Sequence, residues 1–221
     1  MTGLEGFSTQ ELLGEILKRP DSDMIKPGGF VYGNAYPLLD KLGTRVCVDG
    51  APVRYNDRGD VELMAILRGT GKFAGKLCLV GGGVQRKEEN GNEVPESLKE
   101  ALERHFMTDL GVGVEAVGSW DRPHMLAQDM REVDGEVRPG FFRNPASRHL
   151  IAARWLVKLK GDTENMVFGS TEVGGQEALD TVWFTKDDMP ESDAFGYNHD
   201  ITYRHMFDVA HDLAARHALP A

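Results

Sequence analysis

Three consecutive glycines, residues 81–83, separate a short apolar segment from a helical pattern that ends at Gly111. A strand is predicted for residues 76–80, KLCLV, which lead directly into the glycines. A helix is predicted for residues 95–110, because apolar residues recur there at helical spacing. A glycine run indicates a turn or a close approach of the backbone to another group. A phosphate is one candidate, but neither the P-loop pattern nor G-x-G-x-x-G occurs at this junction.

Strand patterns on both sides of this junction indicate a sheet. The predicted strands cover residues 44–50, 61–68, 112–120, 149–160 and 180–184, and a closing helix is predicted over residues 201–217. Turns are predicted at Asp49-Gly50 and over residues 57–60. We therefore expect an α/β (α+β) fold, with a mixed sheet covered by helices on both sides.

The chain divides by pattern into two parts. Residues 1–43 predict an N-terminal helix and a connecting extension, and residues 44–221 predict the main domain. Ser8 and Glu11 form a capping-box pattern at the start of a predicted helix over residues 9–18.

The net charge of −10 argues against a nucleic-acid partner, because phosphate backbones attract basic surfaces. It does not exclude nucleotides, since a bound divalent cation can reverse the local field. No apolar run approaches the roughly 18 residues of a membrane helix, and the N-terminus lacks a secretory pattern. Cys47 and Cys78 lie in apolar stretches and are expected to be buried thiols. We expect a cytoplasmic protein with no membrane partner.

The charged residues of the predicted helix stand at fixed distances from its closing glycine. Glu96 is followed after seven residues by Arg104, and then by Phe106, Asp109 and residues 111–112, Gly-Val. This spacing resembles the Nudix box, G-x5-E-x7-R-E-U-x-E-E-x-G-U, in which U is aliphatic. The resemblance to the Nudix hydrolase superfamily implies a Nudix-like α/β/α sandwich with a mixed sheet.

The sequence departs from that pattern in three places. His105 replaces the glutamate after the arginine, Thr108 replaces the first acid of the closing pair, and residues 87–94 enlarge the gap after the glycines. Superfamily pyrophosphohydrolases gather Mg²⁺ ions with several carboxylates of this helix. Mg²⁺ prefers hard oxygen ligands, which a neutral His and a Thr cannot supply in the same way. The departures therefore favour one ion over a cluster.

One branch of the superfamily carries a similarly shortened box. The matching segments are residues 81–88, GGGVQRKE, residues 101–112, ALERHFMTDLGV, and the positions His149, Gln176 and Glu177. These segments resemble the GDP-mannose mannosyl hydrolases, which cleave the C–O bond at the sugar C1 and leave an intact nucleoside diphosphate. The resemblance implies a small nucleotide-type substrate, with Mg²⁺ (or Mn²⁺) as cofactor.

The resemblance also implies roles for individual residues. The implied metal ligands are Asp109, the carbonyl of Gly82 and the side chain of Gln176. Glu177 stands where the branch has a histidine base and is assigned as the base, although it could also be a metal ligand itself. Arg104 is assigned to the catalytic group. The branch's arginine that supports the leaving diphosphate has no match at the aligned place, and Arg68, Lys72 or Arg86 could substitute for it as a substrate contact. His149 has a counterpart in the branch and is the other expected substrate contact.

Other interpretations of these residues stay open. Arg104 could simply pair with Glu100 one helical turn earlier, and a lone His105 is more often a packed residue than a ligand. An ordinary pyrophosphohydrolase and a non-catalytic nucleotide-binding module are the two alternative functions. A homodimer is also open, because residues 141–142, two phenylalanines in a polar segment, suit a subunit contact as well as a base.

Overall fold

The computed structural model describes residues 25–26, 30–31, 44–71, 73–129, 149–161, 163, 166–169 and 176–219. The chain forms two compact units, Met1–Gly43 with Gln85–Glu96, and Thr44–Val84 with Ser97–Ala221. The helix predicted over residues 9–18 lies outside the described residues, as does the phenylalanine pair at 141–142.

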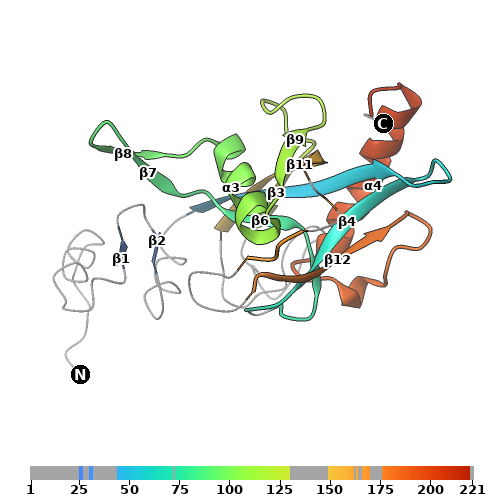
Figure 1. The fold of residues 1–221 in the computed structure, drawn as a ribbon, viewed down its shortest axis with the longest axis horizontal. Coiled ribbons are helices and arrows are strands. Elements are labelled where there is room, and N and C mark those ends of the chain that lie inside the picture. The colour runs from blue at the N-terminus through green and yellow to red at the C-terminus, as the bar shows by residue number, and fades with distance from the viewer. Residues whose placement is uncertain are drawn as a thin grey trace, which may run out of the picture. The chain divides into compact units, whose positions relative to one another are not determined.

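In its described residues, the second unit contains one mixed sheet and two α-helices (Figure 1). Its strands are β3 (Thr44–Tyr55), β4 (Val61–Arg68), β5 (Leu77–Cys78), β6 (Val80–Gly83), β9 (Gly113–Ala116), β10 (Met125–Asp129), β11 (His149–Lys160) and β12 (Ala178–Phe184). Its helices are α3 (Leu98–Leu110), α4 (His199–Ala215) and a short 3₁₀ turn, η3 (Ser192–Ala194). The strand order is β10-β11-β3-β4-β12, with β11 and β3 parallel and the other pairs antiparallel.

Side chains on opposite faces of the sheet join two separate cores, because successive residues of a strand point to opposite sides. Phe106 of α3 packs with Val48 and Trp155 on one face. Tyr203 of α4 packs with Leu63 on the other face. Burial on both faces explains why the β4 sequence reads as a nearly continuous apolar run. The predicted α/β/α sandwich with a mixed sheet is confirmed.

Helix α3 begins and ends with side-chain and glycine caps. The Ser97 hydroxyl accepts a hydrogen bond from the Glu100 amide, and the Glu100 carboxylate accepts one from the Ser97 amide. Gly111 ends the helix in the left-handed conformation, at a φ of 68°. The predicted end is confirmed, but the start at residue 95 was wrong, because Pro95 still belongs to a strand.

The glycine run and the Asp49-Gly50 pair differ from their predicted local structure. Residues 81–83 lie in strand β6, which pairs with residues 47–50 of β3. Asp49-Gly50 is therefore part of a strand and not a turn, whereas the turn predicted over residues 57–60 is present. Both differences arise from long-range pairing, which local sequence does not report.

The inward face of α4 also differs in part from the prediction. Met206 is fully buried as expected, but Ile201 is 40% exposed. Tyr203 and Phe207 fill the core instead, and the Tyr203 hydroxyl donates to the carbonyl of Met64. The helix starts two residues earlier than predicted, at His199.

The described residues of the first unit form two short antiparallel strand pairs. These are β1 (Ile25–Lys26) with β2 (Phe30–Val31), and β7 (Arg86–Glu89) with β8 (Asn92–Pro95). Glu96 closes the second pair: its carboxylate accepts from the Gln85 amide at 2.7 Å, and its own amide donates to the Gln85 carbonyl. The enlarged gap after the glycines is thus a β-hairpin.

Two predictions about composition can be compared with the structure. Cys47 and Cys78 are buried thiols that are not joined in a disulfide, as expected. None of the helices in the described part of the chain is both long and apolar enough to cross a membrane.

Candidate functional site

The glycine strand β6 approaches other parts of the protein more closely than a side chain would permit. A Cβ atom on Gly81 would lie 2.0 Å from the carbonyl oxygen of Val48 in β3. A Cβ on Gly82 would lie 2.6 Å from the ring of His105 in α3. The glycines are therefore required by strand pairing and by contact with the helix.

Two side chains of α3 bind the end of this strand. Arg104 donates from Nη2 to the Gly83 carbonyl oxygen at 3.0 Å. His105 places Nε2 3.3 Å from the same oxygen, and it donates there in the tautomer that carries hydrogen on Nε2. The ring of His105 also covers Gly82 and is largely buried. These contacts fix α3 against β6, so Arg104 has a scaffolding role whatever its part in catalysis.

Asp109 is a buried carboxylate on the last turn of α3. It is 6% exposed, and its oxygen Oδ2 lies 3.9 Å from Nδ1 of His105. Burial, followed by the negative charge of Glu177, raises the pKa of Asp109 to about 7, although Arg104 and Arg68 oppose the rise. The helix dipole also disfavours a negative charge at this end of α3. A cation beside Asp109 would relieve each of these unfavourable interactions.

Arg68, at the end of β4, holds Glu177 just before β12. Its Nη2 lies 2.7 Å from Glu177 Oε1, and Thr70 donates its hydroxyl to Oε2 at 3.3 Å. The backbone reinforces this pair, because the Gly69 amide donates to the Glu177 carbonyl at 2.9 Å. A Cβ on Gly69 would also lie 2.3 Å from the carbonyl oxygen of Gln176. The pair is therefore held by local backbone contacts as well as by charge.

Comparisons with known proteins identify structures of similar fold but no matching family model. No family model matches the chain, and no curated protein matches it. A solved structure of a possible asymmetric diadenosine tetraphosphate hydrolase from Jonesia denitrificans aligns at a TM-score of 0.55. The two sequences are 24% identical, and the alignment covers 81% of this chain and 99% of the other. The chain has the Nudix fold. A MutT Nudix hydrolase from Burkholderia pseudomallei is also similar, with 21% identity, a TM-score of 0.48 and coverage of 74% and 98%.

Within this Nudix fold, only some of the predicted site residues come together. Arg68, Arg104, Asp109 and Glu177 are close enough for their charges to act on one another. Gln176 is exposed and donates to the carbonyl of Phe168 at 3.4 Å.

The structure does not place the other predicted substrate contacts at this site. Lys72 lies outside the described residues, and for His149, the first residue of β11, only the backbone is described. Arg86 is an exposed residue of β7, in the first unit. Their assignment to substrate remains a proposal.

Thr70 and Tyr197 belong to the site but were not predicted. Thr70 contacts Glu177 from 107 positions away in sequence, and no local pattern indicates such a contact. The ring of Tyr197 lies 5.3 Å from the guanidinium of Arg68. Tyr197 has a φ of 54°, which is uncommon for a residue with a side chain, and that value depends on the folded context.

Asp109 and Glu177 are the described carboxylates at which a divalent cation can be considered. No group of three His, Cys, Asp or Glu residues that could hold a metal gathers in the described ranges of the chain. Asp109 and Glu177 are two carboxylates within electrostatic reach, and the first is buried and hard to ionise without a cation. A hard ion such as Mg²⁺ or Mn²⁺ suits a carboxylate ligand like Asp109.

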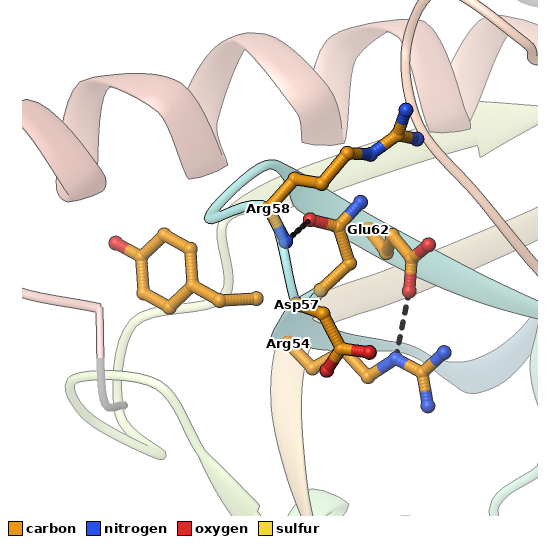
Figure 2. Close-up of a pocket in the computed structure, with 6 residues that line it drawn as sticks. Arg54, Asp57, Arg58 and Glu62 are labelled. Carbon is orange, nitrogen blue, oxygen red and sulfur yellow. Dashed lines mark hydrogen bonds and ion pairs between the residues drawn. The ribbon is translucent and has the colours of Figure 1, made fainter.

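A surface depression of about 550 Å³ lies at the β3–β4 turn and is separate from this site (Figure 2). Arg54 donates to Glu62 at 2.8 Å, and the Arg58 amide donates to the Asn56 side chain. Figure 2 shows the Arg54–Glu62 pair and the bond from the Arg58 amide as dashed lines. Since Arg68 is at the far end of β4, roughly 20 Å along the strand from Glu62, the depression has no part in the candidate site.

Proposed function

We propose that the chain is a hydrolase that depends on one divalent cation and acts on a nucleoside diphosphate derivative. The favoured substrate is a nucleotide sugar, GDP-mannose-like, that is cleaved between the sugar C1 and oxygen. The observation that supports this most is the buried carboxylate of Asp109, which α3 presents beside Glu177.

The number of carboxylates bears on which bond is attacked. When water attacks the sugar C1, negative charge develops on the departing diphosphate, which one cation can stabilise. Attack on phosphorus gains from a second ion that activates the water. The described residues supply no ligand cluster for such a second ion. The sparse ligand set therefore favours attack on carbon.

The side chains of the site have separate roles in the proposed reaction. Glu177 takes a proton from the attacking water, since each of its oxygens has one partner among the described residues and a carboxylate has about four acceptor positions. Arg68 lies beside Glu177 and presents positive charge to the leaving diphosphate. In this proposal Gly82 and Gln176 add oxygen ligands to the cation. Lys72, Arg86 and His149 are proposed to contact the substrate.

Isotope labelling of the products tests the reaction directly. In water enriched in ¹⁸O, with Mg²⁺ and a nucleoside diphosphate sugar, we expect label in the free sugar and none in the nucleoside diphosphate. The reason is that carbon, and not phosphorus, accepts the water oxygen. Mass spectrometry of both products gives the answer, and label in a sugar phosphate or nucleoside monophosphate would establish the pyrophosphohydrolase instead.

Substituting Asp109 by asparagine tests the cation site. We expect Asp109→Asn to lose Mg²⁺ or Mn²⁺ binding by at least about tenfold in calorimetry, because it removes the carboxylate ligand of α3. Asp121→Asn, an exposed acid in the turn after β9, is the matched control and should bind normally. Unchanged binding by Asp109→Asn would refute the assignment.

The same variant carries a stability readout that does not involve the cation. Because the folded-state pKa of Asp109 is raised from 3.8 to about 7, its ionisation destabilises the fold as the pH rises through this range. In cation-free buffer, Asp109→Asn should therefore be as stable as the parent near pH 4, close to the ordinary pKa of 3.8, and more stable than the parent at about pH 8. The gain should be up to about 4 kcal/mol, at about 1.4 kcal/mol per pKa unit.

A non-catalytic nucleotide-binding module is the second candidate. It is favoured by the engagement of both Glu177 oxygens, one by Arg68 and the other by Thr70. A carboxylate held in this way could serve only to orient Arg68 toward a phosphate. Nucleotide binding in calorimetry, with no product from any nucleoside diphosphate derivative or nucleotide tested with Mg²⁺, would support the module.

A further inference from the structure

The chain changes its strand partner at Leu79. Leu77 and Cys78 pair with β4, whereas residues 80–83 pair with β3. A buried backbone amide at such a point needs a hydrogen-bond acceptor outside the regular strand pairing. Leu79 is 4% exposed, and its amide donates to Nδ1 of His199 at 3.0 Å. A side chain of α4 therefore completes the backbone bonding where the glycine strand begins.

His199 is suited to accept this bond. It is 5% exposed, and burial, assisted by the positive charges of Arg154 and Arg68, holds its pKa well below the usual value. The neutral ring carries its hydrogen on Nε2, because Nδ1 accepts from Leu79. Because the ring stays neutral, Nδ1 remains able to accept the hydrogen bond from the Leu79 amide.

The turn that carries His199 is fastened to the same strand. Phe195 forms a parallel bridge with Leu77, and the Gly196 amide donates to the Leu77 carbonyl at 3.0 Å. Tyr197 and Asn198 then have φ values of 54° and 52°. Residues with side chains adopt this left-handed conformation at an energetic cost. This conformation persists because the contacts on both sides of it are fixed.

The position of the glycine strand matters to the candidate site. Gly82 lies against the ring of His105, and the Gly83 carbonyl receives Arg104. These contacts require β6 to keep its present register, and His199 acts at the residue just before β6.

We propose that His199 is a positioning residue for the candidate site, acting through the Leu79 amide to hold β6 against α3. It touches none of the reacting groups in the proposed reaction. The activity part of this inference rests on the proposed function, but the structural part does not.

Two substitutions of His199 separate the hydrogen bond from packing. His199→Leu removes the acceptor and keeps an apolar side chain. His199→Asn offers a carbonyl oxygen close to the place of Nδ1. A loss of a buried acceptor is expected to raise the amide hydrogen exchange of residues 79–83 on the order of tenfold or more in His199→Leu. The asparagine variant should restore most of the protection.

His124→Leu is the matched control. His124 makes the same kind of bond on another strand, since its Nδ1 accepts from the Leu156 amide of β11 at 3.1 Å. It should leave the exchange of residues 79–83 unchanged. Exchange measured by NMR or mass spectrometry needs no substrate, so it remains informative even if the proposed reaction is wrong.

Turnover completes the test. In His199→Leu we expect kcat to fall on the order of tenfold with a smaller change in KM, and His199→Asn should recover it. Parental exchange at residues 79–83 in His199→Leu, or equal loss of protection in the leucine and asparagine variants, would overturn the proposal. Changed exchange with no hydrolysis by the parent protein would contradict the proposed function alone.

Discussion

Replacing Arg154 by methionine should lower the free energy of unfolding by about 3–5 kcal/mol, because the change leaves the buried carboxylate of Asp49 without its positive partner. Arg154 in β11 lies opposite Asp49 in β3, and its Nε donates to Asp49 Oδ2 at 2.9 Å. The two side chains are 6% and 12% exposed, and Arg154 also donates to the Thr202 hydroxyl. Urea unfolding at neutral pH measures the loss.

Three comparisons define this prediction. Replacing both partners, in the double variant Asp49→Leu with Arg154→Met, should recover most of the lost free energy of unfolding, since no unpaired buried charge is left. Arg216→Met, which breaks an exposed pair with Asp212, should cost less than about 1 kcal/mol. A similarly small loss in Arg154→Met would show that the buried pair does not contribute to stability as proposed.

This ion pair also shows which parts of the fold the sequence could predict. Asp49-Gly50 was predicted as a turn because the dipeptide is common in turns. In the structure Asp49 is buried by a partner 105 positions away. In contrast, the spacing of apolar residues within α3 is a local property, and it predicted the helix and its end at Gly111.

The residues of the candidate site also fall into those that the sequence indicated and those that it did not. Arg68, Asp109 and Glu177 were selected through resemblance to a family, and the structure brings their charges together. Thr70 and His199 were not selected, because each acts through a single long-range hydrogen bond that leaves no periodic or motif-like pattern. Local patterns therefore predicted the elements, while the contacts that join them required coordinates.

Replacing Glu177 by glutamine should lower turnover by roughly 10²–10⁴-fold, the range for loss of a general base, while substrate still binds. Glutamine keeps the size of the side chain and can still accept from Thr70, but it cannot take a proton from water. Steady-state kinetics and calorimetry with the intact nucleotide sugar measure the two effects. Glu115→Gln removes a carboxylate that pairs with Lys160 at the surface, and it should leave turnover unchanged.

Because Glu177 contacts Arg68 at 2.7 Å, a loss of turnover could also reflect a misplaced arginine. A double-mutant cycle with Arg68→Met separates the two roles. If Glu177 is the base, Glu177→Gln lowers kcat well beyond the loss in Arg68→Met, and the double variant is no better than Glu177→Gln. If Glu177 only orients Arg68, the two single variants and the double variant lose turnover equally. That result, or retention of more than about a tenth of the parental kcat by Glu177→Gln, would exclude Glu177 as the base.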